Sequence, residues 1–244
     1  MEQQLLNVYG QPLVSNVCDQ ELRELPKLDG ISFAHVIMQA KSESLLHQHN
    51  RMSEIYVITK GRGVLQRGNR AYHVGRGDYL LIPPNTAHKL LNLGGSTLEH
   101  LVFALPPFMP EDVEVLDEEE SDPQLVEYPY EHKIVQAQDG VDIIEFLKAE
   151  ERNELGVSLA LGTLSPISKS AKHCNTRSDE VYFIINGSGV IHLNDNRYQA
   201  PRGAVAYIPP GVPRAFGNSR EDELEILCLC VPGFKEEDFV VLDD

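Results

Sequence analysis

The strongest constraint on the fold is an internal repeat, because residues of the first half recur 126 positions later, as Glu54 recurs at Glu180. The register holds without a gap from about residue 33 to residue 117. The aligned pairs include Tyr56 with Tyr182, Gly61 with Gly187, Gly63 with Gly189, Gly77 with Gly203, Asn92 with Asn218 and Phe108 with Phe234. Chance does not align a whole series of this kind. The sequence therefore indicates a duplication that produced two domains of one design.

Each copy has the pattern of short β-strands. Residues 54–66 and 180–193, "EIYVITKGRGVLQ" and "EVYFIINGSGVIHL", are rich in Val, Ile and Tyr and turn at Gly-x-Gly. In the first copy, residues 77–94 contain a strand, a Pro-Pro break and another strand. This spacing predicts an all-β fold of the sandwich or jelly-roll type with a few short helices. The one longer helix is expected over residues 139–156.

An acidic segment separates the two copies. Residues 111–122 hold eight acidic side chains in twelve positions, which is typical of a solvated linker. We expect a first domain over residues 1–116, a linker over 117–131 and a second domain over 132–244.

Charge and composition exclude several classes of function. The net charge of −16, without a basic run, disfavours nucleic-acid binding because acidic surfaces repel phosphate backbones. No apolar stretch is long enough for a membrane span, and the first residues lack the pattern of a signal peptide. The four cysteines form no CxxC pair, so we expect reduced thiols in a cytoplasmic protein. Cys228 and Cys230 are predicted to be core residues on one strand face.

The first copy carries a candidate set of metal ligands. His47 and His49 are two positions apart in a strand-like stretch, so both point to one face, with Cβ atoms roughly 6–7 Å apart. Glu54 adds a carboxylate from the next strand, and His88 follows the Pro-Pro break. Three imidazoles and a carboxylate suit one divalent ion of Fe, Mn, Ni, Zn or Co. Six-coordinate geometry would leave two open positions, as a catalytic site requires.

The second copy lacks the full set. It keeps His173 and Glu180, but Asn175 and Arg214 stand where the other histidines are expected. An arginine is always protonated and cannot coordinate a metal, so we expect Arg214 to pair with Glu180. Two interpretations of this possible ligand site remain open. The second domain is a degenerate partner that supports the fold, or Arg214 and His173 hold an anionic ligand such as a carboxylate.

These residues resemble the two sequence motifs of the cupin superfamily. The first motif, His-x-His followed by Glu and Gly, is matched at His47, His49, Glu54 and Gly61. The second motif is matched at Gly77, Pro83, His88 and Asn92, with Asn85 where the family has glycine. The second copy fits the same frame at Gly203, Pro209, Gly211 and Asn218. The resemblance implies two tandem cupin barrels, a bicupin, with a 3-His/1-Glu metal centre in the N-terminal barrel and a degenerate site in the C-terminal one.

The resemblance also narrows the function. It implies a metal-dependent enzyme, and we favour a dioxygenase-type oxidoreductase acting on a small organic acid, phenolic or keto substrate. A cupin isomerase, cyclase or decarboxylase is the alternative, as is a non-catalytic protein that binds a sugar or carboxylate. Tyr56 shares a strand face with Glu54 and is a candidate proton donor. We expect a small-molecule partner, no nucleic acid, no membrane, and a monomer or homodimer.

Overall fold

The computed structural model describes residues 4–117 and 123–243 and confirms an all-β architecture. Two compact units are distinguished, residues 11–130 and residues 131–244 together with 1–10. The first unit therefore ends at residue 130, where the expected first domain ends at 116, and residues 1–10 group with the second unit. Residues 118–122 of the expected linker lie outside the described residues. No helix within residues 4–117 and 123–243 is long and apolar enough to cross a membrane.

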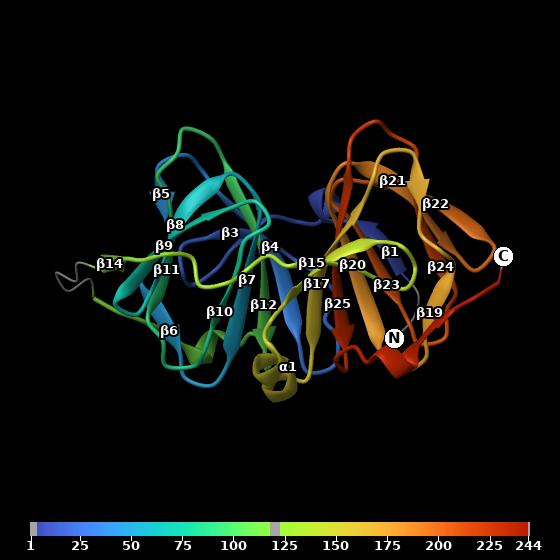
Figure 1. Ribbon diagram of the computed structural model, residues 1–244. Helices are drawn as coiled ribbons and strands as arrows, with labels where there is room; N and C mark the ends of the chain where they lie inside the picture. Colours follow the sequence, from blue (N-terminus) through green and yellow to red (C-terminus); the bar gives the residue numbers. More distant parts are fainter. Residues whose placement is uncertain (1–3, 118–122, 244) are drawn as a thin grey trace. The chain divides into compact units, whose positions relative to one another are not determined.

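The unit of residues 11–130 is built from two antiparallel sheets with one parallel pairing at an edge (Figure 1). The first sheet has the order β10 (Tyr79–Ile82), β7 (Ser53–Lys60), β12 (Leu98–Leu105), β4 (Ser32–Met38), β3 (Glu21–Glu24) and β2 (Val14–Ser15). The second has the order β13 (Val113–Val115), β6 (His47–His49), β11 (His88–Asn92), β8 (Arg62–Arg67), β9 (Arg70–Gly75) and β14 (Gln124–Leu125), with β5 (Ser42–Glu43) beside β11.

The other unit repeats this plan. Its first sheet has the order β1 (Gln4–Asn7), β23 (Ala204–Ile208), β20 (Asp179–Asn186), β25 (Leu224–Val231), β17 (Ser158–Leu164), β16 (Asp142–Phe146) and β15 (Ile134–Gln136). Its second sheet has the order β22 (Asn196–Pro201), β21 (Ser188–Leu193), β24 (Arg214–Asn218), β19 (His173–Asn175) and β26 (Phe239–Val241), with β18 (Ser168–Lys169) beside β24.

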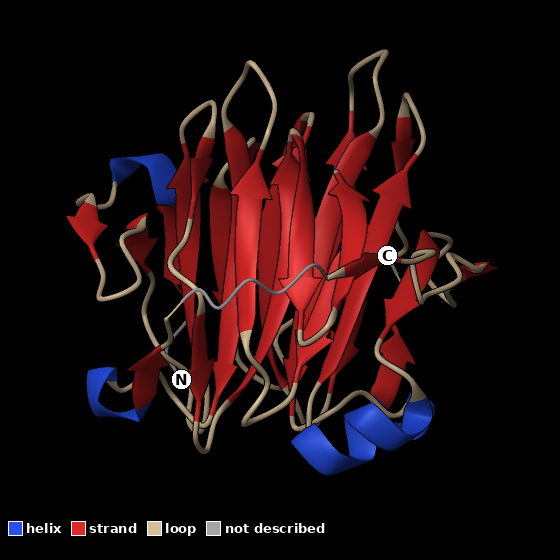
Figure 2. Ribbon diagram, turned by 90° about the vertical axis from the view of Figure 1, so that its left-hand side faces the viewer, coloured by secondary structure: helices blue, strands red, loops and turns tan. Residues whose placement is uncertain are grey.

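Each unit has its own apolar core between its sheets. In the first, inward-facing residues such as Val36, Ile58 and Leu90 pack together from β4, β7 and β11. In the second, Ile184, Phe216 and Ile226 do the same from β20, β24 and β25. Because side chains alternate along a strand, these residues share the strand faces that meet in the core. Figure 2 shows the long strands in red and the few helical segments in blue.

The expected helix over residues 139–156 is only partly correct. Residues Asp142–Phe146 form strand β16, which pairs antiparallel with β17, and only Ala149–Leu155 form the helix α1. Pairing of these residues with β17 overrides the helical propensity of the segment. The helix begins where the Lys148 amide donates to the Glu151 carboxylate at 2.7 Å and ends at Gly156, which is left-handed. Within the described residues, the other helical turns are 3-10 turns at Val8–Gly10, Pro110–Asp112 and Glu236–Asp238.

Candidate metal centre

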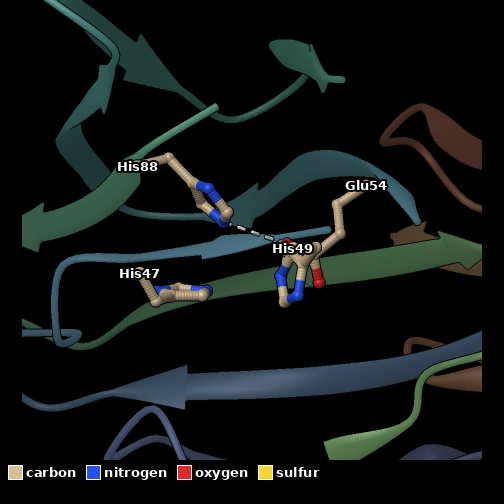
Figure 3. A group of neighbouring side chains, drawn as sticks. All are labelled: His47, His49, Glu54 and His88. Atoms are coloured by element: carbon tan, nitrogen blue, oxygen red, sulfur yellow. Dashed lines mark hydrogen bonds and ion pairs between the residues drawn. The ribbon is translucent and has the colours of Figure 1, made fainter. Parts of the chain in front are cut away.

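Three strands of the first barrel bring the four predicted ligands together (Figure 3). His47 and His49 occupy both ends of the short strand β6, so alternation points both side chains into the barrel. Glu54 lies on β7, and His88 begins β11 directly opposite His47. All four side chains are buried, and their ligand atoms lie within 4.8 Å of one another.

The Glu54 carboxylate lies at the middle of the cluster. The Nε2 atoms of His49 and His88 both lie 3.0 Å from its Oε2. Two donors about 2.1 Å from a common ion and at right angles to each other would be separated by about 3.0 Å. The donor positions therefore fit a transition-metal ion.

Backbone carbonyls fix the orientation of two imidazoles. His47 Nδ1 donates to the Leu45 carbonyl at 2.8 Å, and His88 Nδ1 donates to the Thr86 carbonyl at 2.9 Å. Holding the proton on Nδ1 leaves Nε2 with its lone pair directed into the cluster, which is the arrangement that metal-binding histidines require.

The local electrostatics also match a metal site. Burial, and then the neighbouring His88, lower the pKa of His47 to about 4, so its imidazole is neutral at pH 7. Burial alone would raise the pKa of Glu54, but the close contacts of its carboxylate with His49 and His88 outweigh burial and hold the pKa below its ordinary range. His47 and Glu54 are therefore a neutral imidazole and an ionised carboxylate, the protonation states in which these groups coordinate a metal.

A cavity of about 410 Å³ adjoins the cluster and is lined by His47, His49, Glu54 and Tyr56. Tyr56, the predicted proton donor, is buried, and its ring stacks on His100 with 4.7 Å between centroids. Burial, and then the charge of Glu54, raise the pKa of the Tyr56 phenol well above its usual value.

The second barrel arranges its predicted ligand residues differently. Arg214 forms an ion pair with Glu180, and its Nε donates to the Tyr182 hydroxyl at 3.2 Å. The Asn175 side chain bonds to the nearby backbone: its Oδ1 accepts hydrogen bonds from the amides of Arg177 and Ser178. At the positions of His49 and His88, the second barrel therefore has Asn175 and Arg214, which serve as packing and hydrogen-bonding groups.

The His173 ring contacts a backbone carbonyl and a carboxylate. Its Nδ1 lies 3.0 Å from the Ala171 carbonyl oxygen and 3.3 Å from a carboxylate oxygen of Asp139. Burial, and then the charge of Arg214, lower the pKa of His173 to about 4. The loop residue Asp139 was not singled out from the sequence, because its approach to His173 depends on the fold.

The second barrel has a larger cavity, of about 510 Å³, lined by His173, Glu180 and Tyr182 together with Cys228 and Cys230. Cys230 is buried and Cys228 packs against the apolar core, as predicted, and both also line the cavity. Arg214 is not among the residues that line this cavity.

Comparison with a protein-family model and with known proteins agrees with this geometry. The cupin domain model matches residues 34–103 and 160–230. An uncharacterised protein of Methanocaldococcus jannaschii is 41% identical over 86 residues, which are 35% of this chain and 69% of that protein. An uncharacterised protein of Streptomyces coelicolor is 39% identical over 54 residues, 22% of this chain and half of that protein.

Solved structures of two-barrel proteins cover nearly the whole chain. Tomato vicilin superposes with a TM-score of 0.75 at 15% identity, over 98% of this chain and 87% of vicilin. A formate complex of the oxalate decarboxylase of Lactobacillus farciminis superposes with a TM-score of 0.71 at 13% identity, over 98% and 88% of the two chains. At such identities the likeness shows the fold, and it includes both an enzyme and a storage protein.

Proposed function

This chain belongs to the cupin domain family, and from that premise we propose that its first barrel is the centre of a metal-dependent enzyme. We favour an oxidoreductase of the dioxygenase type that acts on a small organic acid, phenolic or keto compound. The observation that carries the proposal is the buried cluster of His47, His49, Glu54 and His88, of which the first three line a cavity.

The cavity suits a small, mainly apolar substrate. Its volume of about 410 Å³ lies within the range of small-molecule sites. Apolar side chains such as Val102, Ala104 and Phe108 form part of its wall. These residues would hold the carbon skeleton of a substrate whose oxygen atoms face the ligand cluster.

The protein side chains offer little acid–base chemistry. Apart from the ligand cluster, the ionisable groups among the described lining residues are Cys18, Glu24, Lys27 and Tyr56. Burial raises the pKa of the Cys18 thiol to about 12, and the Tyr56 phenol is also neutral. Glu24 and Lys27 are exposed. Outside the ligand cluster, the described lining residues include no buried base, which favours a reaction that depends on the metal over an isomerisation that depends on a protein base.

Each group has a proposed role. His47, His49, Glu54 and His88 would hold a divalent ion of Fe, Mn, Ni, Zn or Co. Such an ion supplies Lewis-acid polarisation of substrate oxygens and, in the case of Fe(II), oxygen activation. Tyr56, as a neutral phenol facing the same cavity, would donate a hydrogen bond or proton to the bound substrate.

A decarboxylase is the second candidate. The observation that favours it is the superposition of nearly the whole chain on oxalate decarboxylase. The same fold comparison includes vicilin, so a non-catalytic small-molecule binding protein is the third reading.

The test is elemental analysis of protein purified without a metal-affinity tag. We expect the wild type to contain about one equivalent more transition metal than His49→Ala, because this substitution removes one imidazole from the cluster. His73→Ala is the matched control, because His73 is exposed on β9 and outside the cluster. If the wild type contains iron, the next assay is oxygen consumption with small acids, phenols and keto acids. If it contains another metal, the next assays are carbon dioxide release and isomerisation.

Two results would overturn the proposal. Wild-type protein that takes up no metal after reconstitution has no metal centre. Equal metal content in the wild type and in His49→Ala would place the ion elsewhere.

A further inference from the structure

The second barrel contains a thiol pair beside its buried carboxylate. On β25, Cys228 and Cys230 are two residues apart and point to the same face. Cys230 lies directly opposite Glu180 of β20, and Cys228 lies opposite Tyr182. All four residues line the cavity of about 510 Å³.

The distances within this group are those of a metal site. The Sγ atoms of Cys228 and Cys230 are 3.8 Å apart, and Cys230 Sγ lies 3.6 Å from Glu180 Oε1. A tetrahedral ion with bonds of about 2.3 Å to sulfur and about 2.1 Å to oxygen would separate its ligands by about 3.8 Å and about 3.6 Å. The three ligand atoms lie within 4.8 Å of one another.

We propose that the second barrel binds a thiophilic divalent ion, Zn(II) in the first instance, through Cys228, Cys230 and Glu180. Thiolates and a carboxylate are ligands that zinc accepts in tetrahedral sites. The fourth position would face the cavity, where water or a small ligand can occupy it. This site is separate from the cluster of the first barrel and does not depend on the function proposed for it.

Arg214 fits this site as a neighbour rather than as an obstacle. Its guanidinium pairs with Glu180 Oε2, while Oε1 of the same carboxylate faces Cys230. Ligating carboxylates commonly use their second oxygen for such a contact. Two thiolates and Glu180, offset by Arg214, carry a net charge of −2, which one divalent ion neutralises.

The metal must displace two protons to bind. In the metal-free chain, the hydrogen bond with Cys228 and then burial raise the pKa of the Cys230 thiol well above its usual value. The Cys230 thiol is therefore protonated before binding, and because metal and protons compete for the ligand atoms, the affinity should fall as the pH falls.

Comparison of the two copies supports an exchange of ligands. At the positions of Cys228 and Cys230 the first barrel has Val102 and Ala104, which line its own cavity. The second barrel thus lacks two of the imidazoles and has two sulfurs on the facing strand. His173 is outside the proposed set, because its ring is not among the ligand atoms that cluster with Glu180.

The experiment is titration of reduced, metal-depleted protein with Co(II), monitored by absorption. We use His49→Ala as the background, so that the first-barrel cluster is disabled. The expected result is an intense near-ultraviolet charge-transfer band from thiolate to cobalt, saturating at one equivalent and lost on addition of Zn(II). Cys228→Val with Cys230→Ala should abolish the band. These replacements are the residues that the first copy carries, so the barrel should accommodate them.

Cys18→Ser is the matched control, because Cys18 lines the other cavity, and this variant should keep the band. If the double variant does not fold, Cys230→Ala alone is used and should lower the band intensity at least twofold. Absence of a thiolate band in the folded background protein, or its survival in the cysteine variants, would overturn the proposal. Neither outcome depends on whether the first barrel binds metal.

Discussion

His100 is a buried imidazole at a position where the second copy has Ile226. It stacks on Tyr56, and neither ring nitrogen has a hydrogen-bond partner within the described residues. Burial, and then the neighbouring His35, lower its pKa to about 3. A buried polar ring without partners reduces stability, so this position offers a direct test of what separates the two copies.

His100→Ile should stabilise the chain, and more so in acid. The folded pKa of about 3 lies below the ordinary 6.5, so the unfolded chain binds more protons between these values. Wild-type stability therefore falls as the pH falls through this window, by about 2 kcal/mol near pH 5 for this group. The variant lacks this loss. Urea unfolding of both metal-free proteins at pH 7 and pH 5 measures the difference, and an identical pH dependence in both would contradict the expectation.

The face on which a side chain lies could be predicted from the sequence, whereas the surroundings of that face could not. His47 and His49 could be placed on one face because alternation along a strand depends only on local geometry. The same rule put Cys228 and Cys230 on one face, but could not show that this face borders a cavity. Whether a strand face is packed or hollow depends on side-chain volumes from distant strands. The contact of Asp139 with His173 was missed for the same reason.

At the scale of elements, the turn that follows the central strand is set by glycine in both copies. Gly61 follows β7 with φ of 81°, and Gly187 follows β20 with φ of 78°. A Cβ on Gly187 would lie 2.5 Å from the Glu223 carbonyl oxygen. The turn thus needs glycine twice, for the left-handed backbone and for the close approach of the neighbouring chain.

Gly187→Ala should therefore destabilise the second barrel strongly. We expect a loss of about 2–5 kcal/mol, since left-handed alanine costs about 1–2 kcal/mol and the steric clash adds about 1–3 kcal/mol. Gly140→Ala is the control, because Gly140 has φ of 87° but no atom within 4 Å of an added Cβ. Urea unfolding compares the two variants. Equal losses would show that the backbone approach at Gly187 is unimportant.

Most strands could be predicted from apolar alternation and turn residues, whereas β16 could not. Residues 139–156 include the charged, helix-favouring segment that forms α1. Its pattern extended the predicted helix over the short strand β16, which precedes it. The strand exists because Asp142–Phe146 pairs with β17, a contact that no local pattern encodes.

At the scale of the whole chain, the N-terminal residues belong to the second barrel. Strand β1 pairs with β23, with Leu5 opposite Ala206, and Leu5 packs against the apolar core of that barrel. In Figure 1 the blue strand β1 lies among orange strands. The repeat could not predict this pairing, because its register begins near residue 33 and leaves the first residues unassigned.

Deletion of residues 1–7 should weaken the second barrel while sparing the metal centre of the first. It removes the pairing of Gln4–Asn7 with Ala204–Tyr207 and exposes β23 as an edge. At about 0.5–1.5 kcal/mol for each lost hydrogen bond, we expect destabilisation on the order of 3 kcal/mol. Amide hydrogen exchange should then accelerate in Ala204–Ile208, while metal binding at His47, His49, Glu54 and His88 stays unchanged. Unchanged protection of β23 after the longer deletion would mean that the second barrel is complete without the start of the chain.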